Sequence, residues 1–526
     1  MDVIDTDDSS IHGNDEENIF INENGVFMRY TQIENIFPLN LQRNVCKLKL
    51  KIDGNLRFAT GFFCYIPSKE VIVLITNYHV IDNNYLSKNK EIKYIIEDNG
   101  QEEERVISLR LKRNKIVNKE LDVTIIEMLD EDNIENFFEV DEDFIKNKNL
   151  KDEKIFSIHY PKGQDLNISF GKVIDCYDNS IEYDIGTAVG SSGSPLISVD
   201  GNKVIGLHKG GYYTKKKKEK IKNIGTILDK IIKLIPQSYS LKHNIIKCTY
   251  YIKKEDLNKD IKVYHNSNNI SEKINDITIQ RQGENGEILG KGMYRFNKEG
   301  KYFFKYKFDD SLNDLSRMFY DCTSLTGVFI PSFPENKITD LSSLFEGCHA
   351  LKNIHFYFNT KDVKDMSGMF KNCQSLEYIN LSSFDTKNVI DMSSMFEYCF
   401  NLQLVDLSSF NTKFVKDMSF MFNRCKKLKD IDLSSFNTEK VKNMSYMFYE
   451  CEALEKLNLS NFKICNVNNM KDMFGYCSSL KVINLTSSQT NEIVDLTNMF
   501  RQCSSLKSII CNDNKINDEF TKKKVI

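Results

Sequence analysis

Eight cysteines in the C-terminal part of this 526-residue chain recur every 26 residues, with one step of 25. They are Cys322, Cys348, Cys373, Cys399, Cys425, Cys451, Cys477 and Cys503. A fixed period of roughly 20 to 50 residues marks a repeat architecture, because one unit is too short to bury its own apolar face. The spacing therefore predicts units that stack into one continuous core, with equivalent side chains about 4.8 Å apart.

Each unit also repeats one order of apolar residues. Cys425, for example, is followed by Leu428, Ile431 and Leu433, and a Leu-x-x-Ile-x-Leu core at this period is typical of leucine-rich solenoids. The segment Asp391–Phe396 reads Asp-Met-Ser-Ser-Met-Phe, which resembles the signature of the BspA-like branch of leucine-rich repeats. The resemblance covers eight units, from about residue 311 to residue 512.

The recurring cysteine predicts an internal column of small, buried thiols. Disulfides between neighbours would have to form pairwise and would distort an even stack. Ligands for zinc must converge on one point, which a linear column does not do. We therefore expect free structural thiols, no metal site and no cofactor.

The predicted location is cytoplasmic. Free thiols favour a reducing compartment. The segment Met1–Asp5 is acidic and lacks the basic-then-apolar plan of a signal peptide. No apolar run approaches the roughly 18 residues that a membrane span needs. A secreted or surface protein is the less favoured alternative.

Positions that vary from unit to unit fall in slots expected to be exposed, at Lys387–Asn388, Lys413–Phe414 and Glu439–Lys440. The repeated Ser-Ser-Phe-(Asn/Asp)-Thr segments between them are expected to turn the coil. Variable surface on a constant frame is typical of a protein-binding face, so we expect a protein partner on the repeats. The alternative for any single slot is a solvated side chain without a role.

A second feature, near the middle of the chain, carries chemistry. The hexapeptide Gly190–Pro195 reads Gly-Ser-Ser-Gly-Ser-Pro. Small residues around Ser192 allow a sharp turn that leaves its hydroxyl exposed and aims the amides of Gly190 and Ser192 at one spot. A nucleophilic serine needs both a base and such an oxyanion hole. The alternative is a tight turn without catalysis.

Two further residues fit this chemistry. An apolar run from Val71 leads to His79, and Asp122 stands at the mouth of a second apolar strand. The order His79, Asp122, Ser192 is the chymotrypsin order of a catalytic triad. From about residue 28 to residue 240 the chain resembles the trypsin-like (chymotrypsin-fold) serine endopeptidases. The resemblance implies that His79 is the general base, Asp122 orients it and Ser192 is the nucleophile.

The surroundings of the motif indicate a specificity pocket. Thr187 precedes Ser192 by five residues, and His208 follows within the run Val204–Gly211. This resembles the glutamyl endopeptidase branch, and implies that Thr187 and His208 hold a substrate carboxylate, with Gly210 also at the substrate. Gly186, where trypsin carries an aspartate, disfavours cleavage after Lys or Arg. Lys209 departs from the pattern, and either adds charge near the pocket or faces solvent.

Two departures from the family concern regulation. Ser191 stands where digestive relatives carry the aspartate that pairs with a newly formed amino terminus, so we expect no activation by that ion pair. Val80 replaces the usual cysteine after the histidine, so we expect no bridge from Cys64 to that position.

We predict a multidomain, all-β architecture. Residues 1–27 form an acidic, disordered tail, and residues 28–240 a chymotrypsin-like protease of two six-stranded β-barrels. Residues 245–310 form a small antiparallel β module that links and caps. Residues 311–512 form the solenoid, and residues 513–526 a charged tail.

The expected function is hydrolysis of protein or peptide substrates by a serine endopeptidase with a recognition array. A net charge of −3 predicts neither nucleic-acid nor membrane binding, and Lys215–Lys218 is read as a solvated hairpin tip. The alternatives are a protein-binding scaffold with an inactive protease domain, and a surface adhesin.

Overall fold

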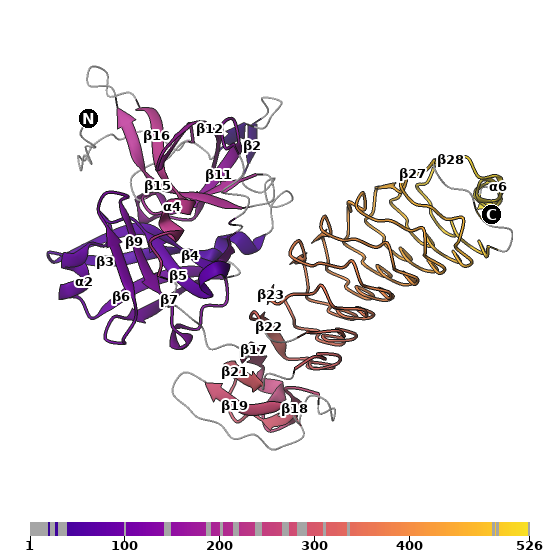
Figure 1. The fold of residues 1–526 in the computed structure, drawn as a ribbon, viewed down its shortest axis with the longest axis horizontal. Helices are drawn as coiled ribbons and strands as arrows, with labels where there is room; N and C mark the ends of the chain where they lie inside the picture. The colour runs from indigo at the N-terminus through magenta and orange to yellow at the C-terminus, as the bar shows by residue number, and fades with distance from the viewer. Residues whose placement is uncertain are drawn as a thin grey trace. The chain divides into compact units, whose positions relative to one another are not determined.

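The computed structural model describes residues 19–21, 27–29, 39–98, 101–140, 142, 149–185, 191–199, 203–213, 220–236, 245–265, 273–280, 292–308, 312–333, 337–486, 490 and 494–523. The chain divides into two compact units, Met1–Leu241 and Lys242–Ile526. Both units consist mostly of β-strands, with a barrel in the first and a stacked, solenoid-like region in the second (Figure 1).

The first half of unit 1 is an eight-stranded sheet built around the hairpin of β3 (Val45–Ile52) and β4 (Asn55–Ile66). The hairpin turns at Asp53 and Gly54, whose φ angles of 48° and 87° suit a tight two-residue turn. The sheet order is β7-β6-β3-β4-β5-β9-β8, with β10 parallel to β4. The other strands are β5 (Val71–Thr76), β6 (Glu91–Asp98), β7 (Gln101–Ser108), β8 (Lys115–Asn118), β9 (Val123–Glu127) and β10 (Phe138–Glu139).

This half differs from the six-stranded barrel that we expected. The described strands run from β7 to β8 without closing, and a side chain joins the ends of β7 and β9 instead. The guanidinium of Arg113 donates to Ser108 O at 3.0 Å and to Glu127 O at 2.9 Å. It also pairs with Asp132 at 2.7 Å, and both side chains are almost fully buried. A buried charge needs such partners, so Arg113 occupies the place of a closing ladder.

The second half of unit 1 is the predicted closed, six-stranded barrel. Its order is β11-β12-β13-β16-β15-β14. The strands are β11 (Lys154–His159), β12 (Asn167–Tyr177), β13 (Ser180–Tyr183), β14 (Pro195–Ser198), β15 (Val204–Tyr213) and β16 (Lys220–Ile227). Both halves contribute to one hydrophobic core, in which Phe62 and Ile75 of the sheet pack with Phe156 and Leu207 of the barrel.

Unit 1 also contains shorter elements. The short helices are α2 (Asn83–Lys88) and α4 (Leu228–Ile232). β1 (Ile19–Ile21), in the segment predicted to be a disordered tail, pairs with β2 (Phe27–Arg29), which begins at the last residue of that segment. The basic run Lys215–Lys218 lies outside the described residues.

Unit 2 begins with a small antiparallel module whose sheet continues into the repeats. β17 (Ile245–Ile252) lies between β21 (Gly300–Phe308) and β22 (Leu325–Ile330), in the order β19-β21-β17-β22-β23. β19 spans Ile274–Gln280, and β23 spans Asn353–Phe356. A second pair joins β18 (Asp260–Lys262) to β20 (Met293–Arg295). The module therefore covers the edge of the first repeat with a hydrogen-bonded strand.

The repeats stack in parallel and share one core with the module. Isolated parallel bridges run from Asp314 through Asp340, Asp365, Asp391, Asp417, Asn443 and Asn469 to Asp495. Short parallel strands form on another side: β24 (Tyr378–Asn380) with β25 (Leu404–Asp406), and β26 (Lys456–Asn458) with β27 (Val482–Leu485) and β28 (Ser508–Cys511). Because each unit bonds only to its neighbours, the region is a linear array.

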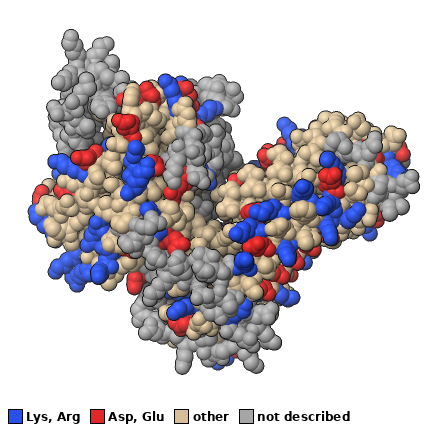
Figure 2. Space-filling model, viewed as in Figure 1, with Lys and Arg blue, Asp and Glu red and all other residues tan. Residues whose placement is uncertain are grey.

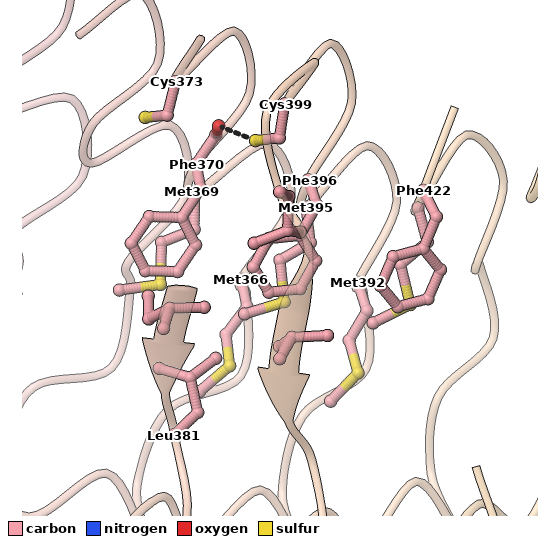
Figure 3. Packing of buried hydrophobic residues seen from close by; sticks show 14 of the residues in the cluster. Met366, Met369, Phe370, Cys373, Leu381, Met392, Met395, Phe396, Cys399 and Phe422 are labelled. Atoms are coloured by element: carbon pink, nitrogen blue, oxygen red, sulfur yellow. Dashed lines mark hydrogen bonds between the residues drawn. The ribbon is translucent and has the colours of Figure 1, made fainter. Parts of the chain in front are cut away.

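A column of phenylalanines runs through this core. Phe370, Phe396 and Phe422 stack face to face with ring centroids 5.5 Å apart (Figure 3). The column extends from Phe319 to Phe500. It ends at each side on a ring placed edge-on: Tyr306 of β21 at 5.8 Å and Phe520 at 5.7 Å. These edge-to-face contacts close a stack that would otherwise expose an aromatic face.

The recurring cysteines are free thiols, and the eight of the column are fully buried. The Sγ of Cys399 donates to the carbonyl oxygen of Phe370 in the preceding unit at 3.1 Å (Figure 3). The cysteines from Cys348 to Cys503 all make this bond, at 2.9–3.3 Å. Each thiol therefore satisfies a buried carbonyl and links two units.

The predicted charged tail contains a helix, α6 (Asn514–Lys523). Its Ile516 and Phe520 are buried in the repeat core, so this amphipathic segment covers the last unit. Among the described residues, no helix combines the length and the apolar character needed to cross a bilayer.

Candidate active site

His79 and Asp122 meet at the ends of two adjacent strands. β5 ends at Thr76 and β9 begins at Val123, so the antiparallel pair brings the residues after β5 beside those before β9. Asp122 Oδ2 lies 2.8 Å from His79 Nδ1, and Asp122 Oδ1 accepts a bond from the backbone amide of His79 at 3.1 Å. The carboxylate thus holds both the ring and the backbone of the histidine.

The backbone of Asp122 is shaped for this contact. Its φ of 52° lies in the left-handed region, which an aspartate tolerates better than most residues. Its carbonyl accepts a hydrogen bond from the side-chain amide of Asn77 at 3.0 Å. The side chains of His79 and Asp122 are 32% and 19% exposed. The pair is therefore partly shielded while the ring stays accessible to a substrate.

Ser192 lies on a tight turn held by two neighbouring strands. Its carbonyl accepts a bond from the amide of Thr60 in β4 at 3.1 Å. The amide of Gly193 donates to His208 O at 3.3 Å, and the amide of His208 donates to Ser194 O at 2.9 Å. The turn is therefore anchored to both halves of unit 1.

Gly193 is required by this turn. Its φ is +87°, a conformation that L side chains rarely adopt. A Cβ there would overlap the carbonyl oxygen of Thr60 and the hydroxyl of Thr76. Those two groups are already bonded to each other at 2.9 Å, so neither can yield easily.

Two residues of β11 brace the same turn, and the sequence analysis did not assign them a role. The Oγ of Ser191 lies 2.7 Å from His159 Nδ1, and His159 Nε2 lies 3.0 Å from Ser169 Oγ. Ser157 donates to Pro195 O at 2.8 Å and lies 3.0 Å from Ser194 Oγ. All but Ser169 are buried. His159 follows Ser157 by two residues, so both side chains lie on one face of the strand. This spacing was the sequence signal that could have indicated their shared role.

The bracing explains the departure at Ser191. Where digestive relatives carry an aspartate at this position, the buried hydroxyl of Ser191 here lies next to the imidazole of His159, whose ring nitrogens can donate or accept a hydrogen bond. Cys64 is a free thiol, and Val80 is buried.

The structure does not join the nucleophile directly to the base. Among the described residues, no hydrogen bond connects Ser192 Oγ to the ring of His79. Such contacts are often long without substrate and tighten when substrate binds. Gly190, whose amide was predicted to line the oxyanion hole, lies outside the described residues.

His208 is brought next to the turn, but Thr187 lies outside the described residues. The His208 side chain is buried, and its Nδ1 is hydrogen-bonded to the hydroxyl of Tyr183. Burial raises the pKa of Tyr183 well above its usual value. When the Tyr183 hydroxyl donates to Nδ1, a neutral ring carries its proton on Nε2. That tautomer presents the donor that a carboxylate requires.

The neighbours of His208 on β15 differ in character. Lys209 is half-buried, and burial lowers its pKa, with the charge of Asp122 acting in the opposite direction. Lys209 therefore interacts electrostatically with the carboxylate of Asp122 in the predicted triad. A Cβ at Gly210 would meet no atom within 4 Å, so open space adjoins it.

Within the described part of the chain, no group of three or more His, Cys, Asp or Glu residues is arranged to hold a metal ion.

Two family models match the chain. Residues 59–207 match the "Trypsin-like peptidase domain", a range that contains His79, Asp122 and Ser192. Residues 313–404 and 399–513 match the family described as "Mycoplasma protein of unknown function, DUF285". No curated protein matches the sequence. Residues 59–207 thus form a trypsin-like peptidase domain, a class of domain that acts on proteins or peptides.

Solved structures also resemble the chain. The serine endoprotease from Yersinia pestis shows 12% identity and a TM-score of 0.30, over 40% of this chain and 68% of that one. The MamO protease domain from Magnetospirillum magneticum shows 11% identity and a TM-score of 0.28, over 38% and 98%. Tobacco etch virus protease shows 17% identity and a TM-score of 0.25, over 38% and 76%.

Proposed function

We propose that unit 1 is an active serine endopeptidase using His79, Asp122 and Ser192. His79 removes the proton of the Ser192 hydroxyl as its oxygen attacks a peptide carbonyl. The amides of Gly190 and Ser192 hold the oxyanion, and His79 passes the proton to the leaving amine as the C–N bond breaks. Water, deprotonated by His79, then hydrolyses the acyl-enzyme and restores the hydroxyl.

The observation that carries this proposal is the double contact of Asp122 with His79. A hydrogen bond to Nδ1 puts the imidazole in the tautomer whose Nε2 can accept a proton. The bond to the backbone amide limits the positions of the ring relative to the carboxylate. A relic site without selection for catalysis has no need of both.

We further propose a preference for an acidic residue before the scissile bond. His208 supplies an Nε2 donor when neutral and a charge when protonated, and Thr187 supplies a hydroxyl. Lys209 adds a cation near the site. Chromogenic peptides ending in Glu, Lys and Phe, compared side by side, test the preference. Fastest turnover of the Lys-ended peptide would contradict it.

The repeats are proposed to bind a protein, which raises the concentration of one target near the protease. The substrate would then be selected both by the protein that the repeats bind and by the residues around the scissile bond. The proposed cellular site is a reducing compartment, in keeping with the free thiols.

Covalent labelling tests the catalytic proposal. A fluorophosphonate probe should label the wild-type protein at Ser192 and fail to label Ser192→Ala, while far-UV circular dichroism shows that the variant folds. Absence of labelling in a folded wild-type protein would favour the binding scaffold with an inactive protease domain.

A further inference from the structure

One edge of the repeats carries an unusual set of charges. In the four segments 361–364, 387–390, 413–416 and 439–442, the exposed positions hold seven lysines and one acid, Glu439, while Asp362 is half-buried. The lysines are Lys361, Lys364, Lys387, Lys413, Lys416, Lys440 and Lys442. We call this set the lysine edge. Figure 2 shows basic side chains along the repeats with acidic ones among them.

The lysine edge is regular because its backbone is a ladder. The amide of Ile390 donates to Lys364 O, that of Lys416 to Ile390 O, and that of Lys442 to Lys416 O, each at 2.8 Å. Units bonded in this way place equivalent side chains about 4.8 Å apart. Lys416 and Lys442 are therefore like charges stacked directly on each other.

Elsewhere the stack pairs opposite charges. Lys371 meets Glu397 at 2.9 Å, Lys426 meets Glu452 at 2.7 Å, and Lys481 meets Glu455 at 2.6 Å, each across one unit. At the lysine edge, among the described residues, no carboxylate lies within ion-pair distance of Lys364, Lys413, Lys416, Lys440 or Lys442. Stacked like charges destabilise a ladder, so folding alone does not account for this edge.

The neighbouring aspartates do not neutralise the edge. Asp365, Asp391 and Asp417 directly follow ladder positions, but they are half-buried and bond backbone amides two residues on, at 2.8 Å each. Burial raises the pKa of Asp391, with Asp365 and Asp417 adding to the effect. Alternate residues of an extended segment face opposite ways, so the lysines face solvent.

Two apolar side chains lie within the same edge. Phe414 and Ile390 are each 40% exposed. Lys413 and Lys440 approach the Phe414 ring at 5.8 and 4.2 Å. Within the edge, Lys387 pairs with Asp385 at 2.7 Å. The edge thus combines the five lysines that have no described carboxylate in range with an aromatic and an aliphatic contact, and exposed aromatic groups of this kind supply contact area at interfaces.

We propose that the lysine edge docks an acidic, extended segment of a partner protein that also carries an apolar residue for Phe414. Its carboxylates would stand opposite the stacked lysines and relieve their repulsion. A polynucleotide fits less well, because its backbone is charged at every step and would meet Asp362 and Glu439. This inference rests on the proposed recognition role of the repeats and not on catalysis.

Fluorescence anisotropy tests the docking. The full chain with Ser192→Ala, which cannot cut the probe, is titrated with a fluorescein-labelled peptide rich in Glu with a central Phe. The same peptide with Gln for Glu, and a single-stranded oligonucleotide, are the comparison probes. The triple variant Lys364→Gln, Lys416→Gln, Lys442→Gln should bind the Glu peptide about tenfold more weakly or worse.

A matched control removes the same charge elsewhere. Lys371→Gln, Lys426→Gln and Lys481→Gln together should change the dissociation constant less than about twofold. Equal weakening by both triples, equal binding of the Gln peptide, tighter binding of the oligonucleotide, or no binding of the Glu peptide would each overturn the proposal. Thermal melting checks that both triples fold. A wild-type protein that binds the Glu peptide but resists fluorophosphonate leaves the docking intact and refutes hydrolysis.

Discussion

Asp122 holds His79 at two points, the ring nitrogen Nδ1 at 2.8 Å and the backbone amide at 3.1 Å. A single carboxylate therefore fixes both the tautomer and the position of the His79 ring. It is set by the register of β5 with β9, in which Thr76 pairs with Thr124.

Asp122→Asn should keep the fold and lose most of the activity. Asparagine also tolerates a positive φ, but its amide stabilises the wrong tautomer, and the loss expected in kcat is about 10⁴-fold. Turnover of a Glu-ended chromogenic peptide measures it. Glu120→Gln, an exposed change two residues away, is the control and should leave kcat within about twofold. Similar losses in both variants would contradict the role given to Asp122.

Gly193→Ala should destabilise unit 1. The strained φ and the overlap with Thr60 together should lower the free energy of unfolding by about 2–5 kcal/mol. Gly54→Ala is a matched control, because Gly54 has the same φ of 87° but no atom within 4 Å of a Cβ. It should lower the free energy by about 1–2 kcal/mol. Urea denaturation compares them, and equal losses would show that the close approach to Thr60 is unimportant.

His159 should act as a positioning residue. His159→Leu leaves the hydroxyls of Ser191 and Ser169 without this partner, at about 1–3 kcal/mol for the buried Ser191 hydroxyl. We expect kcat to fall by about tenfold or more while KM changes little, since the residue braces the turn and does not touch the substrate. His159→Gln, which keeps hydrogen-bonding atoms, should recover part of kcat. A fall in stability with unchanged kcat would reduce His159 to a structural role.

The column thiols should resist labelling in the folded protein. Burial raises the pKa of the seven column thiols from Cys322 to Cys477, and the thiolate is the reactive form. At pH 8, Ellman's reagent should react quickly with the exposed Cys465 and not with the column. Cys465→Ser should remove most of the fast reaction, and guanidinium should expose the other thiols. Fast reaction of column thiols in the folded chain would contradict the packing.

Alkali should destabilise the repeats. Burial raises the pKa of Cys399 to about 12, and a hydrogen bond with the backbone at Cys373 has a smaller effect that lowers the pKa. Because the pKa of Cys399 is higher in the folded protein than in the unfolded chain, its contribution to the free energy of unfolding is complete below the unfolded-state pKa, near 9.0. The contribution is lost as the pH rises toward the folded-state pKa of about 12. Between pH 7.5 and pH 10, Cys399 should contribute a loss on the order of 1 kcal/mol to the free energy of unfolding. Urea unfolding followed by circular dichroism measures it, and Cys399→Ala should reduce the pH dependence by that amount.

Much of the candidate site was visible in local sequence patterns. An apolar strand before His79, another after Asp122 and small residues around Ser192 were enough to propose the triad, because each signal lies within a few residues. His159 was not assigned a role from the sequence. Its contact with Ser191 spans 32 residues and depends on how β11 pairs with β14, which local pattern does not encode.

The amino-acid sequence by itself determined that the C-terminal region is a stacked array and that small residues surround Ser192, because periodicity and turn chemistry are properties of short segments. Only the tertiary structure decided that the Cys399 thiol bonds to Phe370 O, that Arg113 joins the ends of β7 and β9, and that Lys416 and Lys442 stack without a carboxylate between them. Those relationships depend on which backbones become neighbours, and hydrogen-bond registers between distant segments set that choice.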